Sequence, residues 1–343
     1  MQNLLNKIEN IAQKNISYLS DNGKMKPGHN GLYYDQETPV RNTAHWLIIF
    51  SKLYSINKNP EFKKAIKQAA KYLLNPENRP SGKTYHCRYS EQKDKCNGLI
   101  GQAWVIEALA EASKTLNDSR YDDTAIDLFL LHPFDKDYGL WNRVEIDGSI
   151  LSFDPTFNHQ LWFVYAGALL SSNEKIHNQV TTFLNELDNN LTVLENGLIY
   201  HPIERIQQEN ASIPFSKKMK RFVKKMLKPS KTTNHQKLLD KSIGYHAFNT
   251  YAFSQIQKIF PSHPFWKSDA YLKIMNYLLT DEYITNLENN IYGYPYNPPG
   301  FEIPVSLNEN FLDENGIEPL GFYQHWVQKQ FDKCFNKETN DMS

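Results

Sequence analysis

Side chains that could perform acid–base chemistry lie in short turn-rich segments, each directly before a predicted helix. Asp154 is the clearest example, because it precedes the apolar run that begins at Phe157, and the N-terminal end of a helix stabilises a carboxylate. An N-cap role for Asp154 is the alternative. Hydrolysis needs a second carboxylate or a water-orienting partner, and Asp35, Glu37 and Glu302 lie on predicted loops of the same kind.

A second set of candidates consists of histidines at equivalent helical positions, and it would support a different reaction. The four are His45, His159, His246 and His325. Two facing imidazoles could remove a proton from a carbon atom and return it, which is the chemistry of an epimerase. A single histidine on a helix more often has a structural role, but four at one repeat position favour a function.

These histidines belong to a short signature that occurs five times, each time at the start of an apolar helical run. Each copy ends in a large aromatic residue and has a His or Gln within the preceding three positions. The copies are Thr43–Trp46, Gly101–Trp104, His159–Trp162, Tyr245–Phe248 and Tyr323–Trp326. A turn and a β-favouring fragment precede each copy, so one unit is predicted to be strand, loop, inner helix and outer helix. The spacing of roughly 55 to 90 residues is too long for tetratricopeptide or HEAT arrays.

The repeat predicts an all-α fold, an (α/α) toroid of about five to six helical hairpins with short β-strands in the rim loops. Because the repeat covers nearly the whole length, we expect a single domain over residues 1–343, with an insertion at 205–242. The fifth unit is predicted to carry a Pro/Gly-rich loop through Pro304 and to end in a helix from Gly321 to Phe335. The N-terminal helix can serve as the partner of that last helix.

Aromatic and polar groups at the helix starts and on the rim strands are the candidates for substrate binding. Sugars pack their C–H faces on aromatic rings, and their hydroxyls need polar partners of the kind that line small-molecule sites. The candidates are His45, Trp46, Arg88, Gln102, Trp104, Trp141, Arg143, Gln160, Trp162, Tyr200, His201 and Trp326. For each aromatic residue the alternative is a core position between helices.

Composition excludes several classes of function. The formal net charge is zero, so overall charge does not suggest nucleic acid as a partner. No apolar stretch approaches the roughly 20 residues of a membrane span, and the first twenty residues lack the apolar block of a signal peptide, which favours a cytoplasmic location. The cysteines Cys87, Cys96 and Cys334 show neither paired nor metal-ligand spacing. We therefore expect no metal, and we also expect no cofactor.

The architecture and the aromatic-rich helix starts resemble the six-hairpin glycosidase-like (α/α) toroids, which include unsaturated glucuronyl hydrolases, N-acylglucosamine 2-epimerases and several polysaccharide lyases. Within this superfamily, the chain is similar to bacterial exopolysaccharide-biosynthesis members. The resemblance implies a carbohydrate-active enzyme of cell-surface polysaccharide biosynthesis, a hydrolase or lyase that cleaves or trims an oligosaccharide or lipid-linked glycan. Two alternatives are a sugar epimerase with paired histidines, and a non-catalytic glycan-binding or scaffold subunit at the membrane.

The insertion carries a different pattern. Residues 214–229 begin and end with proline, and seven cationic residues lie opposite an apolar side. This pattern is typical of a helix that lies on an anionic membrane surface. The predicted membrane contacts are Phe215, Lys217, Lys218, Phe222, Lys224, Lys225 and Met226. Such contacts would make the protein peripheral on the inner membrane, beside membrane-bound polysaccharide assembly machinery. The alternative is an outer helix with a solvated basic face.

Overall fold

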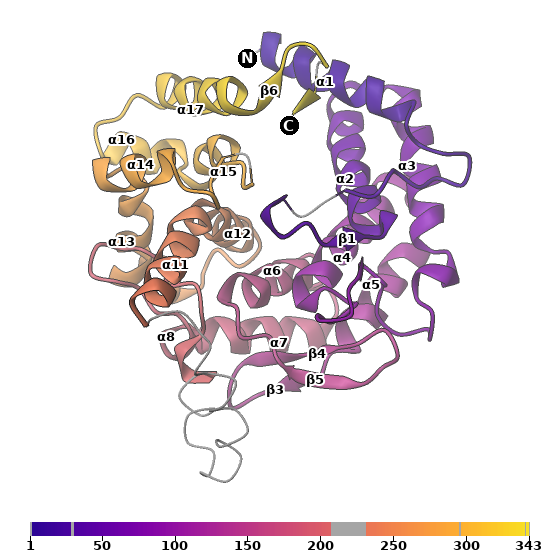
Figure 1. Ribbon diagram of the computed structural model, residues 1–343, viewed down its shortest axis with the longest axis horizontal. Helices are drawn as coiled ribbons and strands as arrows, with labels where there is room; N and C mark the ends of the chain where they lie inside the picture. The colour runs from indigo at the N-terminus through magenta and orange to yellow at the C-terminus, as the bar shows by residue number, and fades with distance from the viewer. Residues whose placement is uncertain (1, 29–30, 207–230, 295, 340, 343) are drawn as a thin grey trace. The chain divides into compact units, whose positions relative to one another are not determined.

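The chain forms two compact units in a computed structural model that describes residues 2–28, 31–206, 231–294, 296–339 and 341–342 (Figure 1). Unit 1 comprises Met1–Asp154, Trp162–Thr182 and Asn336–Asp341, and unit 2 comprises Pro155–Leu161, Phe183–Phe335 and Met342–Ser343. The chain enters each unit more than once, so the units are not successive segments of sequence. The single domain over residues 1–343 stays a prediction.

Unit 1 is built mainly from five helices, of which α2 packs on α1, α3 and α4 (Figure 1). In order they are α1 (Gln2–Ile16), α2 (Pro39–Asn57), α3 (Pro60–Leu73), α4 (Gly98–Leu116) and α5 (Arg120–Leu130). Two short 3₁₀ helices, η1 (Gly31–Tyr33) and η2 (Pro76–Asn78), lie in the connections. The helical hairpins predicted for the first two sequence repeats, α2–α3 and α4–α5, are therefore present.

Local sequence explains where these helices begin and which side they bury. Pro39 occupies the first turn of α2, where a missing N–H leaves no helical hydrogen bond unmade, and the Thr38 side chain accepts from the Val40 N–H. In α3, apolar residues at helical spacing are buried, which is the pattern of an amphipathic helix. By contrast, α4 is buried on most sides. The difference matches the predicted outer and inner positions.

Short antiparallel strands precede the buried helices of unit 1. Strand β1 (Gln36–Glu37) pairs with β2 (Arg88–Tyr89), so that Glu37 lies opposite Arg88. Strands β3 (Phe134–Asp135), β4 (Leu140–Val144) and β5 (Ile150–Phe153) form one sheet in that order. These strands are the predicted rim elements: β1 precedes α2, β2 precedes α4, and β3–β5 precede α6.

A glycine fixes how the second rim loop meets α4. A Cβ at Gly101 would lie 2.6 Å from the Cys96 carbonyl oxygen and 3.1 Å from Cys87 Sγ. Any larger residue would push the loop away from the first turn of the helix. This close approach holds residues 87–96 against α4.

The chain then passes between the units in α6 (Phe157–Ala168) and α7 (Glu174–Asn185). The remaining elements are α8 (Leu187–Asn190), α11 (Lys231–Gly244), α12 (His246–Ile259), η3 (Pro264–Lys267), α13 (Asp269–Tyr277), α14 (Asp281–Glu288), α15 (Pro299–Ser306), α16 (Glu309–Glu314), α17 (Pro319–Cys334), β6 (Phe335–Asn336) and β7 (Asp341–Met342). In unit 2, α15 packs on both α12 and α17. Four signatures, at 43–46, 101–104, 159–162 and 323–326, lie in the N-terminal halves of α2, α4, α6 and α17. The signature at 245–248 begins at the N-cap residue of α12 and continues into its first turn.

The fifth repeat unit differs from the sequence prediction. Only the last part of the segment predicted as a loop through Pro304 belongs to the helix α15, whose Gly300, Glu302 and Ile303 are buried. Pro299 starts this helix at a position that needs no N–H, and the helix is short enough to tolerate Pro304 inside it. For these residues the prediction of a loop was wrong, because Pro299 and Pro304 indicate helix breaks although the residues between them have helical apolar spacing.

Candidate functional site

The strand before α2 and the first turn of α2 bring an acid and a base together. Arg41 Nε lies 2.9 Å from Glu37 Oε2, and Glu37 is only 4% exposed. Burial raises the pKa of Glu37, the Arg41 charge opposes that shift, and the nearby Asp35 carboxylate adds to it. Glu37 thus retains a proton more readily than an exposed glutamate does.

Trp104 supplies an aromatic surface next to this ion pair. The Arg41 guanidinium carbon lies 5.4 Å from the centre of the Trp104 ring, and the His45 and Trp104 ring centres are 5.0 Å apart. Arg41 and His45 are four residues apart, so they lie on the same side of α2, which packs on α4. His45 and Trp104 are partly exposed. An aromatic face bordered by polar groups suits a sugar ring.

The imidazole of His45 is a hydrogen-bonding group, not a charged one, at neutral pH. Burial, and after it the Arg41 charge, lower the pKa of His45 to about 3. An uncharged ring offers one donor and one acceptor nitrogen. His45 can therefore orient a hydroxyl beside Trp104 without adding a positive charge.

Asp35 is the second carboxylate near Glu37. It accepts a hydrogen bond of 2.6 Å from Lys93 Nζ and lies 3.8 Å from Arg88 Nη1. Asp35 and Glu37 are two positions apart in an extended segment, which directs their side chains to the same side. The backbone of Gly28 approaches the same pair, since a Cβ there would lie 3.7 Å from Glu37 Oε2. We call Asp35, Glu37, Arg41, His45 and Trp104 the Glu37 cluster.

Arg88 and Arg143, two predicted binding residues, are held by carboxylates of the rim. Arg88 donates to Asp94 Oδ1 at 2.9 Å and to Asn97 Oδ1 at 2.8 Å. Arg143 donates to Asp94 Oδ2 at 2.7 Å. Asp94 thus bridges both guanidinium groups and also accepts from the Gly98 N–H at the start of α4. These bonds position the rim loops next to the Glu37 cluster.

Asp154 contacts the N-terminal end of α4, a helix that precedes it in sequence. Its Oδ2 accepts from the Leu99 N–H at 3.2 Å, in the first turn of α4, and the residue is 3% exposed. Its charge also acts to raise the pKa of buried His132, although desolvation by burial, the larger effect, lowers that pKa to about 4. A carboxylate in this place stabilises α4, and a catalytic role for Asp154 stays a prediction.

Gln102 is fully buried and joins the rim loop to α4. Its side-chain oxygen accepts from the Tyr85 N–H at 2.8 Å, and its nitrogen donates to the Cys96 carbonyl at 2.7 Å. Burying a glutamine without hydrogen bonds would be unfavourable, and here the backbone groups of Tyr85 and Cys96 supply those bonds. Gln160 of unit 2 is likewise fully buried.

The predicted aromatic residues differ in exposure. Trp141 is fully buried and contacts the rings of Phe129 and Phe163, while Trp326 is 2% exposed and Trp162 is 8% exposed. Trp46 and Trp104 keep part of their surface accessible. Among the signature tryptophans, the accessible ones both belong to unit 1.

The three other signature histidines lie in unit 2 and have different surroundings. His246 is fully buried, and its ring nitrogens lie 3.0 Å from the Ile274 carbonyl oxygen and 3.3 Å from the Ile199 N–H. His325 is exposed on α17, and His159 is partly exposed. His246 therefore joins two backbone segments. In unit 1, His45 is the only one of the four signature histidines.

The last two predicted binding residues lie on the rim segment of unit 2. The His201 ring centre is 5.0 Å from that of Tyr245, and the backbone N–H of His201 donates to Ser242 Oγ at 2.9 Å. Burial, followed by the charge of Glu204, raises the pKa of Tyr200. Both residues are partly exposed.

Arg41 is the member of the cluster that sequence reasoning missed. Arg41 precedes the signature, which begins at Thr43, and the sequence indicates only that Arg41 lies at the start of a helix. The signal available was the spacing of four between Glu37 and Arg41, which favours an ion pair on a helical turn. Burial of that pair cannot be seen in the sequence.

The part of the chain that the structure describes contains no group of His, Cys, Asp and Glu side chains that could hold a metal ion. None of its helices is long and apolar enough to cross a membrane. The predicted membrane helix at 214–229, with Phe215, Lys217, Lys218, Phe222, Lys224, Lys225 and Met226, lies outside the described residues.

Comparison with solved structures identifies the fold. The structure superposes on cellobiose 2-epimerase from Bacillus thermoamylovorans with a TM-score of 0.68 at 12% identity, covering 100% of this chain and 90% of that one. A sugar epimerase from a ruminal bacterium gives 0.66 at 12% identity, with 98% and 89% covered. The fold is the (α/α) toroid that these epimerases have, as predicted. At such low identity the likeness shows the fold alone.

Sequence comparison gives a closer relationship. No family model matches the chain. However, it is 38% identical to archaeal glycosylation protein Q of Haloferax volcanii, and the alignment covers 99% of this chain and 92% of that protein. Because the similarity extends along nearly the whole of both chains, the protein belongs to the family of archaeal glycosylation protein Q.

Proposed function

We propose that the protein is a carbohydrate-active enzyme of glycosylation that cleaves or trims a glycan at the Glu37 cluster. Its membership of a glycosylation protein family supports the setting. One observation carries the chemistry: a buried carboxyl group, Glu37, whose pKa is raised, lies near a second carboxylate, Asp35, that binds Lys93. Paired carboxylates in unlike environments are the usual acid and base of glycoside hydrolysis.

In this mechanism, Glu37 donates its proton to the glycosidic oxygen as the bond from that oxygen to the sugar carbon breaks. Asp35 accepts a proton from water while the water oxygen forms a bond to the same carbon, so one water molecule is consumed for each bond cleaved. Trp104 packs against the sugar ring, and His45 orients a hydroxyl. Once Glu37 has released its proton, its carboxylate pairs with the Arg41 guanidinium.

The histidine-based alternative has less support. An epimerase would need two imidazoles near one carbon atom, and His246 uses both ring nitrogens for backbone contacts. We therefore favour cleavage over epimerisation. Synthesis of exopolysaccharide and a lipid-linked substrate remain predictions.

Glycan analysis in cells tests this proposal. Cells of the source organism that lack the gene should accumulate protein-linked or lipid-linked glycans that still carry the sugar removed by the enzyme. Wild-type protein should restore the normal mass spectrum. The variants Glu37→Gln and Asp35→Asn should fail to restore it although they fold.

Glu91→Gln is the matched control, because Glu91 is an exposed acid of the same rim loop. It should restore the spectrum fully. Restoration by Glu37→Gln would show that the Glu37 cluster is not the catalytic site. Unchanged glycans in the deletion strain would contradict a role in glycan processing.

A further inference from the structure

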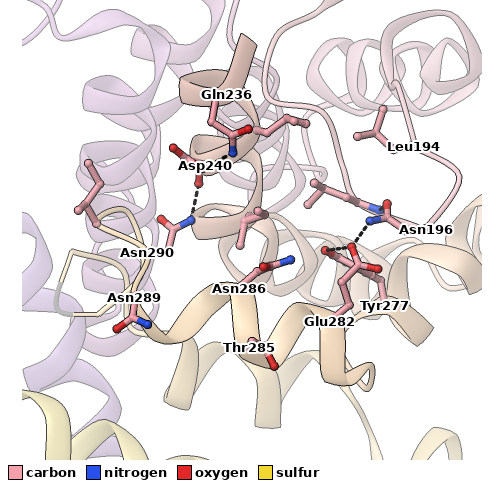
Figure 2. A pocket seen from close by; sticks show the side chains of 14 residues that line it. Leu194, Asn196, Gln236, Asp240, Tyr277, Glu282, Thr285, Asn286, Asn289 and Asn290 are labelled. Atoms are coloured by element: carbon pink, nitrogen blue, oxygen red, sulfur yellow. Dashed lines mark hydrogen bonds between the residues drawn. The ribbon is translucent and has the colours of Figure 1, made fainter. Parts of the chain in front are cut away.

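Unit 2 contains a cavity of about 630 Å³ (Figure 2). Its lining residues share no sequence segment with the Glu37 cluster, which belongs to unit 1. Its walls are residues 194–198, one side of α11, Tyr277, one side of α14, and the turn at 289–291. The volume falls in the range of small-molecule sites, about 300–1,000 Å³. The cavity is therefore large enough for a ligand of a few rings or a short chain.

The two helices each present one face to this cavity. The lining positions are spaced by three, four and seven residues, which places them in a single stripe along each helix. On α11 they are Gln236, Leu239, Asp240 and Ile243, and on α14 and its end they are Glu282, Thr285, Asn286 and Asn289. The α11 stripe combines polar and apolar side chains, and the α14 stripe is polar.

Amide side chains dominate the polar part of the lining. They are Asn196, Gln236, Asn286, Asn289 and Asn290. An amide carries both donors and an acceptor, which is the combination that a sugar hydroxyl requires. Asn196 and Asn290 use both amide atoms in internal hydrogen bonds. Asn286, on the exposed side of α14, and Asn289, at its end, are therefore the amides that would meet a ligand. Figure 2 shows the Asn286 side chain extending from α14 into the space between α11 and the 194–198 segment.

Internal hydrogen bonds hold the two lining carboxylates in place. Glu282 Oε1 accepts from Asn196 Nδ2 at 2.7 Å and from the Tyr277 hydroxyl at 3.3 Å. Asp240 Oδ1 accepts from Gln236 Nε2 at 2.9 Å (Figure 2). The wall is thus organised before a ligand arrives, which lowers the cost of binding.

Charge restricts the class of ligand. Among the described residues, those that line the cavity include no lysine or arginine, whereas Asp240 and Glu282 are among them. A phosphate or a uronic acid would meet negative charge without a cation to balance it. The apolar lining that keeps exposed surface, Leu194, Leu239 and Ile291, provides contacts for C–H faces.

We propose that this cavity, which we call the amide cavity, is a second glycan-binding site and takes a neutral oligosaccharide. Hydroxyl groups would exchange hydrogen bonds with the amides, and ring C–H groups would pack on the apolar wall. The proposal does not depend on the reaction at the Glu37 cluster. A site of this kind would hold one part of a glycan while another part is processed.

Binding of defined trisaccharides tests the proposal. Neutral trisaccharides of glucose, mannose and galactose should be titrated into the full-length protein by calorimetry, with saturation-transfer NMR as a second readout. At least one should bind saturably, and a trisaccharide with a uronic acid in place of a neutral sugar should bind at least about tenfold more weakly, a difference of about 1.4 kcal/mol.

Variants locate the binding. Asn286→Ala should weaken binding of the neutral trisaccharide at least about tenfold, while Asn310→Ala, an exposed asparagine on α16, should leave it unchanged. Equal binding by wild type and Asn286→Ala, a preference for the acidic sugar, or no binding of any neutral trisaccharide would each overturn the proposal. Because Glu37→Gln leaves the amide cavity intact, it should retain this binding even where it loses turnover.

Discussion

Replacing Glu302 with glutamine should change how stability depends on pH. Glu302 lies in α15, is 6% exposed, and its Oε2 has no hydrogen-bond partner among the described residues. Burial raises the pKa of Glu302 from 4.5 to about 8. The folded protein therefore holds a proton on this group at a pH where the unfolded chain has released it.

The sign of the effect follows from this difference in bound protons. Between pH 4.5 and about 8 the unfolded state binds fewer protons at Glu302, so the free energy of unfolding falls as the pH rises. The slope for one group is about 1.4 kcal/mol per pH unit, which amounts to about 4 kcal/mol between about pH 5 and pH 8. Glutamine cannot ionise, so Glu302→Gln should escape this loss.

Urea unfolding of both proteins at several pH values measures the difference directly. Glu302→Gln should become progressively more stable than wild type as the pH increases. Glu107, whose pKa burial raises to about 7, contributes equally to both proteins and cancels in the comparison. Glu309→Gln, at an exposed position in α16, is the control and should give the same difference at every pH. Parallel curves for wild type and Glu302→Gln would refute the argument.

Three further predictions concern other parts of the chain. Because burial lowers the pKa of His246 to about 4, its contribution to stability should be complete above pH 6.5 and lost as the pH falls towards 4, measured by urea unfolding. Asp154→Asn should lower the free energy of unfolding by about 1 kcal/mol through the weaker interaction with the start of α4; lost turnover at unchanged stability would instead assign Asp154 to catalysis. The protein should sediment with anionic vesicles in a salt-sensitive way, and replacing Lys217, Lys218, Lys224 and Lys225 with Glu should release it; failure of wild type to bind any vesicle would exclude the membrane helix.

The sequence predicts the helical framework well because burial follows its spacing. In α3, Phe62, Ile66 and Ala69 are buried while the lysines between them face outward, as their spacing requires. The signature likewise marks helix starts correctly. By contrast, α15 was not predicted, because proline usually breaks a helix. Pro299 lies in the first turn of α15, where proline is tolerated, and Pro304 lies inside the helix.

The candidate site could be predicted only in part. Residue type and position identified His45 and Trp104, but their partner Arg41 matters because of contacts made in three dimensions. Gln102 shows the reverse case, since its backbone partners at Tyr85 and Cys96 come from a loop whose path the sequence does not reveal. Such long-range contacts decide whether a polar residue is structural or available to a substrate.

The reaction in isotopically labelled water is the most direct test of cleavage at the Glu37 cluster. Purified protein should be incubated with glycans from the deletion strain, once in water enriched in oxygen-18 and once in heavy water. Hydrolysis predicts one oxygen-18 atom in the released sugar, no carbon-bound deuterium, and no product with Glu37→Gln. Deuterium bound to a sugar carbon without release of any sugar would establish epimerisation, and an unsaturated product without oxygen-18 would establish a lyase; either result would contradict hydrolysis by Glu37 and Asp35.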